Sequence, residues 1–174
     1  MKIIEYSNKK ILVFIARIIY WLAWQLNMVI MQTSNELEFS SDKFIGILTN
    51  YENLSGYLPR QLQKIEIIEK NENLTKIKAV ILLRSLIKQE FVLEIEIEEK
   101  SYGLFIANIL DGIAKGTKIT ITISEQNMKT LCDIETDVKL SLKTIVLLPI
   151  IKREYKGFVQ GILSNILNKV NKKE

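Results

Sequence analysis

The chain has 174 residues, of which 48% are hydrophobic, and this is enough to close one domain around a single core or cavity. The formal net charge is +4, but +3 of it lies within the first 32 residues, so the rest of the chain is nearly neutral. A near-neutral body argues against nucleic-acid binding, and the absence of histidine excludes histidine-dependent catalytic relays and histidine-bearing zinc sites, so we expect neither a nucleic-acid partner nor a cofactor.

The most apolar stretch is ILVFIARIIYWLAWQLNMVIM at residues 11–31. Arg17 lies near its centre, and if the first strand begins at Met28 the remaining apolar part is shorter than the roughly 20 residues of a membrane span. Three interpretations are open: a membrane-associated or signal-anchor helix that contacts a membrane surface through residues 11–26, an extra helix packed on the domain, or an upstream start. We expect a cytoplasmic protein, associated with membranes if the first interpretation holds.

From Gln32 onward the chain consists of short segments that alternate apolar and polar residues. QTSNELEF is predicted to be a strand, followed by a short helix KFIGILTN that Ser41 or Asp42 can cap, and then by YENLSGYLP as a second short helix or turn. Six more strands are predicted at LQKIEIIEK (62–70), LTKIKAVILL (74–83), KQEFVLEIEIEE (88–99), YGLFIANIL (102–110), TKITITIS (117–124) and KTLCDIETDVKL (129–140). The alternation gives each strand one apolar and one solvated face, which is typical of an antiparallel sheet.

The last segment changes its period from two to between three and four. Pro149 suits the first turn of a helix, and apolar residues then recur every three or four positions from Ile151 to Val170. This pattern predicts a long amphipathic helix of about six turns. Gly157 and Gly161 interrupt it, which indicates either close backbone approach or unfilled space, and a tight contact between helix and sheet without a cavity is the alternative.

The stretch DGIAKGTKI, residues 111–119, carries two glycines around a lysine and raises the possibility of a phosphate-binding loop. A P-loop requires four residues between its glycines and a Lys-Ser/Thr pair before a helix. Here three residues separate Gly112 from Gly116, threonine precedes lysine, and the stretch runs into a strand. We therefore expect a tight link between two strands and no phosphate site.

One strand, two short helices, six strands and a long helix predict an α+β, helix-grip fold: a seven-stranded curved antiparallel sheet wrapped around a long C-terminal helix. With this order the sequence resembles the START/polyketide-cyclase (SRPBCC) superfamily, in particular its coenzyme-Q-binding and cyclase/dehydrase branch. The resemblance covers about residues 31–170 and rests on the order of elements and on TNYENLSGYLP (49–59), DGIAKGTKITITI (111–123) and CDIETDVKLSL (132–142). The domain would occupy residues 28–174, and the N-terminal apolar helix, residues 1–27, is an addition that this core does not require.

The resemblance implies an elongated cavity between sheet and helix for a lipid, an isoprenoid quinone, a sterol or a polycyclic molecule. The large aliphatic side chains on the inner face of the predicted sheet lead to the same expectation. We therefore expect a binding or carrier protein for a hydrophobic small molecule, with the two short helices as a gate. The residues expected to bind the ligand are Tyr51, Tyr57, Arg84, Leu93, Ile95, Ile121, Ile134, Thr136, Phe158 and Ile162.

Some of these side chains have alternative roles. Tyr51 and Tyr57 could hydrogen-bond a ligand or pack over the short helices, and Arg84 could meet an acidic ligand head or end in solvent. Cys132 is the single cysteine, so it forms no internal disulfide, and its place in an alternating strand predicts a buried thiol rather than a nucleophile.

Two other functions are compatible with the superfamily. A polyketide cyclase or dehydrase needs a polar pair inside the cavity, whereas the alternation turns Asp133, Glu135 and Asp137 outward. A ribosome-interacting, toxin-like protein needs a basic face, which the nearly neutral body does not support. The pattern therefore favours binding over both alternatives.

Overall fold

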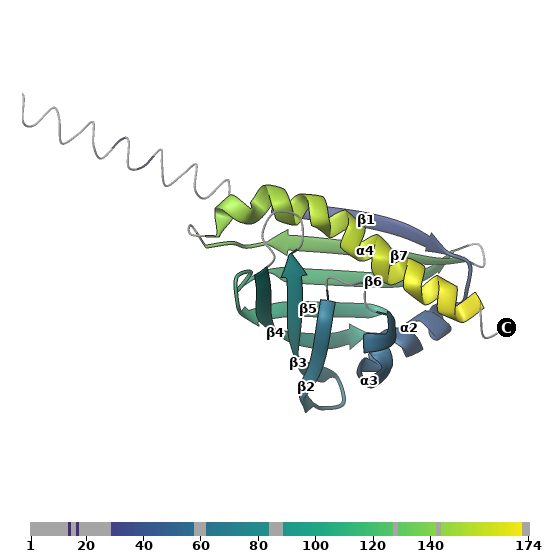
Figure 1. Cartoon of the computed structure of the whole chain (residues 1–174). Coiled ribbons are helices and arrows are strands. Elements are labelled where there is room, and N and C mark those ends of the chain that lie inside the picture. The colour runs from purple at the N-terminus through teal and green to yellow at the C-terminus, as the bar shows by residue number, and fades with distance from the viewer. Residues whose placement is uncertain are drawn as a thin grey trace, which may run out of the picture.

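The structure is a computed structural model that describes residues 14, 17, 29–57, 62–83, 89–126, 129–141 and 144–171. These residues form one seven-stranded antiparallel sheet that curves around a long C-terminal helix, the helix-grip fold that the sequence predicts (Figure 1). The elements are β1 (Val29–Leu37), α2 (Ser41–Thr49), α3 (Tyr51–Leu54), η1 (Ser55–Tyr57), β2 (Leu62–Lys70), β3 (Leu74–Leu83), β4 (Gln89–Ser101), β5 (Leu104–Asp111), β6 (Lys118–Gln126), β7 (Lys129–Val138), η2 (Ile145–Leu147) and α4 (Leu148–Asn171).

The strands lie in the order β1-β7-β6-β5-β4-β3-β2, and every neighbouring pair is antiparallel. The first strand therefore pairs with the last, in a register that runs from Val29 opposite Val138 to Leu37 opposite Thr130. α4 follows β7 after the short helix η2 and folds back over the concave face of the sheet (Figure 1).

Most element boundaries lie within about two residues of the predicted ones, and the start of β1 and the cap of α2 differ for clear reasons. β1 begins at Val29, three residues before the predicted start, because Val29 and its neighbours pair with the end of β7. The cap of α2 is Ser40, whose hydroxyl accepts a hydrogen bond from the backbone N–H three residues later at 3.4 Å. The prediction of Ser41 or Asp42 as the cap is therefore wrong, since both lie in the first turn of the helix.

The link between β5 and β6 is tight, as predicted. Gly112 and Gly116 have φ angles of 102° and 87°, in the left-handed region that favours glycine. A Cβ atom on Gly112 would lie 2.4 Å from the carbonyl oxygen of Val92, so only glycine fits there. The glycines serve close backbone approach and form no phosphate loop.

A solid core fills the space beneath the second half of α4. Ile166 is 0% exposed and Phe44 of α2 is 1% exposed, and both belong to one apolar cluster with side chains from β1, β5, β6 and β7. Cys132 is 1% exposed in the same cluster, which confirms the predicted buried thiol. Burial, and to a smaller extent Asp133, raises the pKa of this thiol to about 12, so it is protonated and no nucleophile near neutral pH.

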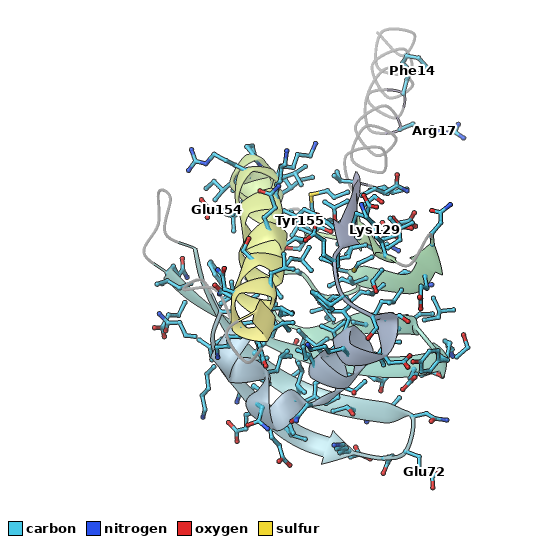
Figure 2. The ribbon with its side chains drawn as sticks, turned by 90° about the vertical axis from the view of Figure 1, so that its right-hand side faces the viewer. Phe14, Arg17, Glu72, Lys129, Glu154 and Tyr155 are labelled. Carbon is cyan, nitrogen blue, oxygen red and sulfur yellow. The ribbon has the colours of Figure 1, made fainter. Side chains whose placement is uncertain are left out.

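The predicted N-terminal helix, residues 1–27, lies outside the described residues except for Phe14 and Arg17, which are helical and exposed (Figure 2). Among the helices that the structure describes, none combines the length and the apolar character needed to cross a membrane.

Candidate functional site

A cavity of about 180 Å³ lies between the first half of α4 and the sheet. The side chains around it come from six strands, from the β5–β6 link and from α4: Met31, Ile81, Phe91, Leu93, Ile109, Ile113, Ala114, Thr117, Ile119, Thr136, Val138, Ile151, Glu154, Tyr155 and Phe158. The surface that these residues present to the cavity is apolar. A cavity with such a surface is suited to an uncharged, apolar group.

Local periodicity explains why these residues meet. Phe91 and Leu93 are two positions apart on β4 and so point to the same, inner face of the sheet. Ile151, Tyr155 and Phe158 are four and three positions apart on α4, which places them on one face of the helix. The sheet forms the floor of the cavity and this stretch of α4 forms its roof.

The polar groups in the wall are satisfied by the protein. The hydroxyls of Thr136 and Tyr155 hydrogen-bond each other at 2.8 Å, across the space between β7 and α4. Burial raises the pKa of Tyr155, and the hydrogen bond from Thr136 offsets part of that rise. The Thr117 hydroxyl donates to the backbone carbonyl of Lys139 at 3.2 Å and accepts from its N–H at 2.9 Å. These hydroxyls stiffen the wall and do not form an acid/base pair directed at a ligand.

Glu154 is the one acidic residue among the described residues around the cavity. Its side chain is 20% exposed, and one carboxylate oxygen lies 3.9 Å from the guanidinium of Arg153. Tyr155 lies on the flank of α4 that faces β1, whereas Glu154 lies on the opposite flank (Figure 2). Among the described residues around the cavity, no second carboxylate accompanies Glu154 to form an acid/base pair of carboxyl groups.

Three of the predicted ligand-binding residues line the cavity: Leu93, Thr136 and Phe158. Four others instead pack against the solid core, namely Tyr57, Ile121, Ile134 and Ile162. They lie on the inner face, as predicted, but further along the strands and the helix, at the end where α2 packs. Tyr57 also lies under the Lys169 ammonium, 4.6 Å from the ring centre.

Two of the remaining three predicted residues, Tyr51 and Ile95, are not among the described residues that line the cavity. Tyr51 hydrogen-bonds Thr75, and its burial raises the pKa of its phenol. Ile95 is half-buried on β4, opposite Ile77 on β3 and Ile109 on β5. Arg84 lies outside the described residues.

The two short helices, which are predicted to be a gate, pack at the other end of α4 from this cavity. No residue of α2, α3 or η1 is among the described residues that line it. Phe44 and Ile45 of α2 pack instead into the core cluster at the other end of α4. Their apolar side chains fill the core at that end. The cavity is lined instead by residues of the sheet, the β5–β6 link and the start of α4.

The sequence reasoning missed several cavity residues. Ile151 and Tyr155 belong to the apolar stripe that predicted α4, so the stripe itself could have identified them. Ile113 and Ala114 of the β5–β6 link had no such signal, because a loop has no periodicity that points a side chain inward.

No protein-family model matches the sequence, and no curated protein matches it either. Solved structures match the fold. A START superfamily protein from Mycobacterium smegmatis aligns with a TM-score of 0.68 and 12% identity over 83% of this chain and 99% of its own. An aromatase/cyclase from Streptomyces sp. R1128 aligns with a TM-score of 0.68 and 11% identity over 82% of this chain and 96% of its own. Norcoclaurine synthase from Thalictrum flavum aligns with a TM-score of 0.63 and 14% identity over 84% of this chain and 89% of its own.

Proposed function

We propose that this chain, which has the START/polyketide-cyclase helix-grip fold, binds a hydrophobic small molecule between the sheet and the first half of α4. The observation that carries the proposal is the apolar cavity beneath a helix whose other half is solidly packed. Transfer of apolar ligand surface from water into such a cavity is favourable by about 25 cal/mol per Å². We propose Leu93, Thr136 and Phe158 as ligand contacts, together with Ile119 and Ile151.

The size of the cavity limits the ligand. An apolar cavity of about 150 Å³ accommodates benzene, and sites for drug-sized ligands are about 300–1,000 Å³. At about 180 Å³, this cavity suits one ring or a short chain. A lipid, an isoprenoid quinone or a polycyclic molecule would place only its apolar end inside.

Two observations support binding over catalysis. The hydroxyls of Thr136 and Tyr155 bond each other, and the surface of the cavity is apolar. A cyclase or dehydrase would require an inward polar pair, which Tyr51 and Tyr57 do not supply because neither lines the cavity. Contact of residues 11–26 with a membrane surface stays a separate proposal, which would allow the ligand to be loaded from a bilayer.

The test uses toluene, titrated into the full-length chain and followed by methyl NMR. Ile119 on β6 lines the cavity, so Ile119→Phe should fill it and weaken toluene binding by about tenfold or more. Thr122→Phe is the matched control, because it adds a ring to the exposed face of the same strand. Toluene-induced shifts that ignore Ile119→Phe, or that map to the outer face of the sheet, would contradict the proposal.

A further inference from the structure

A second depression lies on the other side of the cavity wall, between the edge strand β1 and α4. Met31 on β1 and Tyr155 on α4 line both this groove and the apolar cavity. The two sites therefore adjoin each other at these side chains. Tyr155 lies on the flank of α4 that faces β1, as the groove requires (Figure 2).

The groove differs from the cavity in its chemistry. Thr33 and Asn35 line it from β1, and the Thr33 hydroxyl and the Asn35 amide nitrogen are buried without a hydrogen-bond partner. A buried polar group without a partner is costly, so natural structures nearly always supply one. An acceptor group in the groove would supply a partner to the Asn35 amide.

The opposite wall of the groove is positively charged. Lys152 and Lys156 line it from α4, are exposed, and are four residues apart on the same face of the helix. Like charges at this spacing repel each other, and an anion placed between them would offset the repulsion. No acidic residue is among the described residues that line the groove.

The charged groups nearby do not cancel these lysines. Gln32 of the groove donates from its side chain to the Glu135 carboxylate at 2.6 Å, on the exposed side of β1. Glu154 lies on the flank of α4 away from β1 and is near Arg153 (Figure 2). The groove thus offers an incoming ligand the unpartnered Asn35 amide and Thr33 hydroxyl, together with the two ammonium groups.

We propose that the ligand is amphipathic, with its apolar end in the cavity and a carboxylate in the β1–α4 groove, and that Met31 and Tyr155 separate the two parts. This inference rests on the proposed function, because it assigns the polar end of the same ligand. The carboxylate lies between Lys152 and Lys156 and accepts a hydrogen bond from the Asn35 amide.

The test compares two probes that share a tail of suitable size for the cavity, 3-phenylpropanoate and 3-phenylpropan-1-ol. Isothermal titration calorimetry with the full-length chain should give an affinity about tenfold higher for the acid, because only the acid presents an anion to the lysines. In Lys152→Gln/Lys156→Gln, the acid should lose this advantage, whereas the affinity for the alcohol should change by less than about twofold.

Two further variants distinguish binding in the groove from general effects of net charge and from misfolding. Lys78→Gln/Lys118→Gln removes the same charge from exposed positions on β3 and β6, and should leave both affinities unchanged. Asn35→Asp keeps the shape of the side chain but replaces the donor with a carboxylate, and should weaken the acid by more than about tenfold. The alcohol then reports whether the variant still folds and binds.

Each outcome has a defined meaning. Equal affinity of the wild-type chain for the acid and the alcohol, or an equal loss of acid binding in the two double lysine variants, would overturn the groove assignment and leave the cavity standing. If neither probe bound, the proposed function would be contradicted as well.

Discussion

The two halves of α4 carry the same apolar stripe and yet cover very different interiors. Residues 159–170 close a solid core with Leu37, Phe44 and Ile45, whereas residues 151–158 roof a cavity of about 180 Å³. The difference comes from outside the helix, because α2 inserts Phe44 and Ile45 beneath the second half only. A helix with a uniform apolar stripe can therefore cover a solid core at one end and a cavity at the other.

The largest effect is expected from a comparison of the same substitution, isoleucine to alanine, in the two halves of α4. Ile166→Ala in the solid half should lower the free energy of unfolding by about 3–4 kcal/mol, because the tightly packed site cannot collapse around the lost atoms. Ile151→Ala, which only enlarges an existing cavity, should cost less than about 2 kcal/mol. Urea denaturation measures both.

The pair is internally controlled, because both substitutions remove the same atoms and gain the same helix propensity. Equal losses for Ile166→Ala and Ile151→Ala would mean that the first half of α4 is packed as tightly as the second, and that no cavity exists in solution.

Cys132 tests how well the solid half excludes water. Its folded-state pKa of about 12 lies above the ordinary value of 9.0, so the unfolded chain releases the thiol proton first as the pH rises. This thiol's contribution to stability is complete below pH 9 and declines as the pH rises from 9 towards 12. Between pH 8 and 10.5, the wild type should lose about 2 kcal/mol more than Cys132→Val.

The measurement is urea unfolding of both proteins at the two pH values. Since all other titrating groups are shared, the difference between the proteins isolates the thiol. A pH dependence that is the same with and without Cys132 would show that water reaches this part of the core.

Alternation and helical period predicted the elements of the fold well. β2 and β3 begin and end at the predicted residues, and Pro149 lies in the first turn of α4 as expected. These patterns record which face of an element is inward, and they depend only on residues that are neighbours in the sequence. The family resemblance followed from the order of the elements and from three sequence segments, whereas the strand order comes from the structure.

The candidate site was predicted only in part, for a physical reason. Periodicity placed Ile121, Ile134 and Ile162 correctly on the inner face. It did not predict where along the sheet the solid core ends and the cavity begins. That position depends on where the α2 side chains enter, which is a long-range contact. Leu93, Thr136 and Phe158 lie beyond that point and line the cavity.

Tyr155 lies at the boundary between the two halves, since it lines the cavity and also packs against the core. Tyr155→Phe removes its hydrogen bond to Thr136 and leaves a buried hydroxyl without a partner, so it should cost about 1–1.5 kcal/mol. Thr136→Val/Tyr155→Phe should recover most of this loss, because it removes both polar groups. Urea denaturation of the two single variants and the double variant gives the coupling energy, and additive effects would exclude the bond as a stabilising contact.

The smallest effect concerns the outer side of α4 over the cavity. A Cβ atom on Gly157 would meet no atom within 4 Å, so this glycine serves no close backbone approach and leaves helix propensity unused. Gly157→Ala should raise the free energy of unfolding by about 0.5–1 kcal/mol, and Ser164→Ala, at an exposed position over the solid half, should give a smaller gain. A loss of stability in Gly157→Ala, measured by the same denaturation assay, would mean that another part of the chain covers this face of the helix.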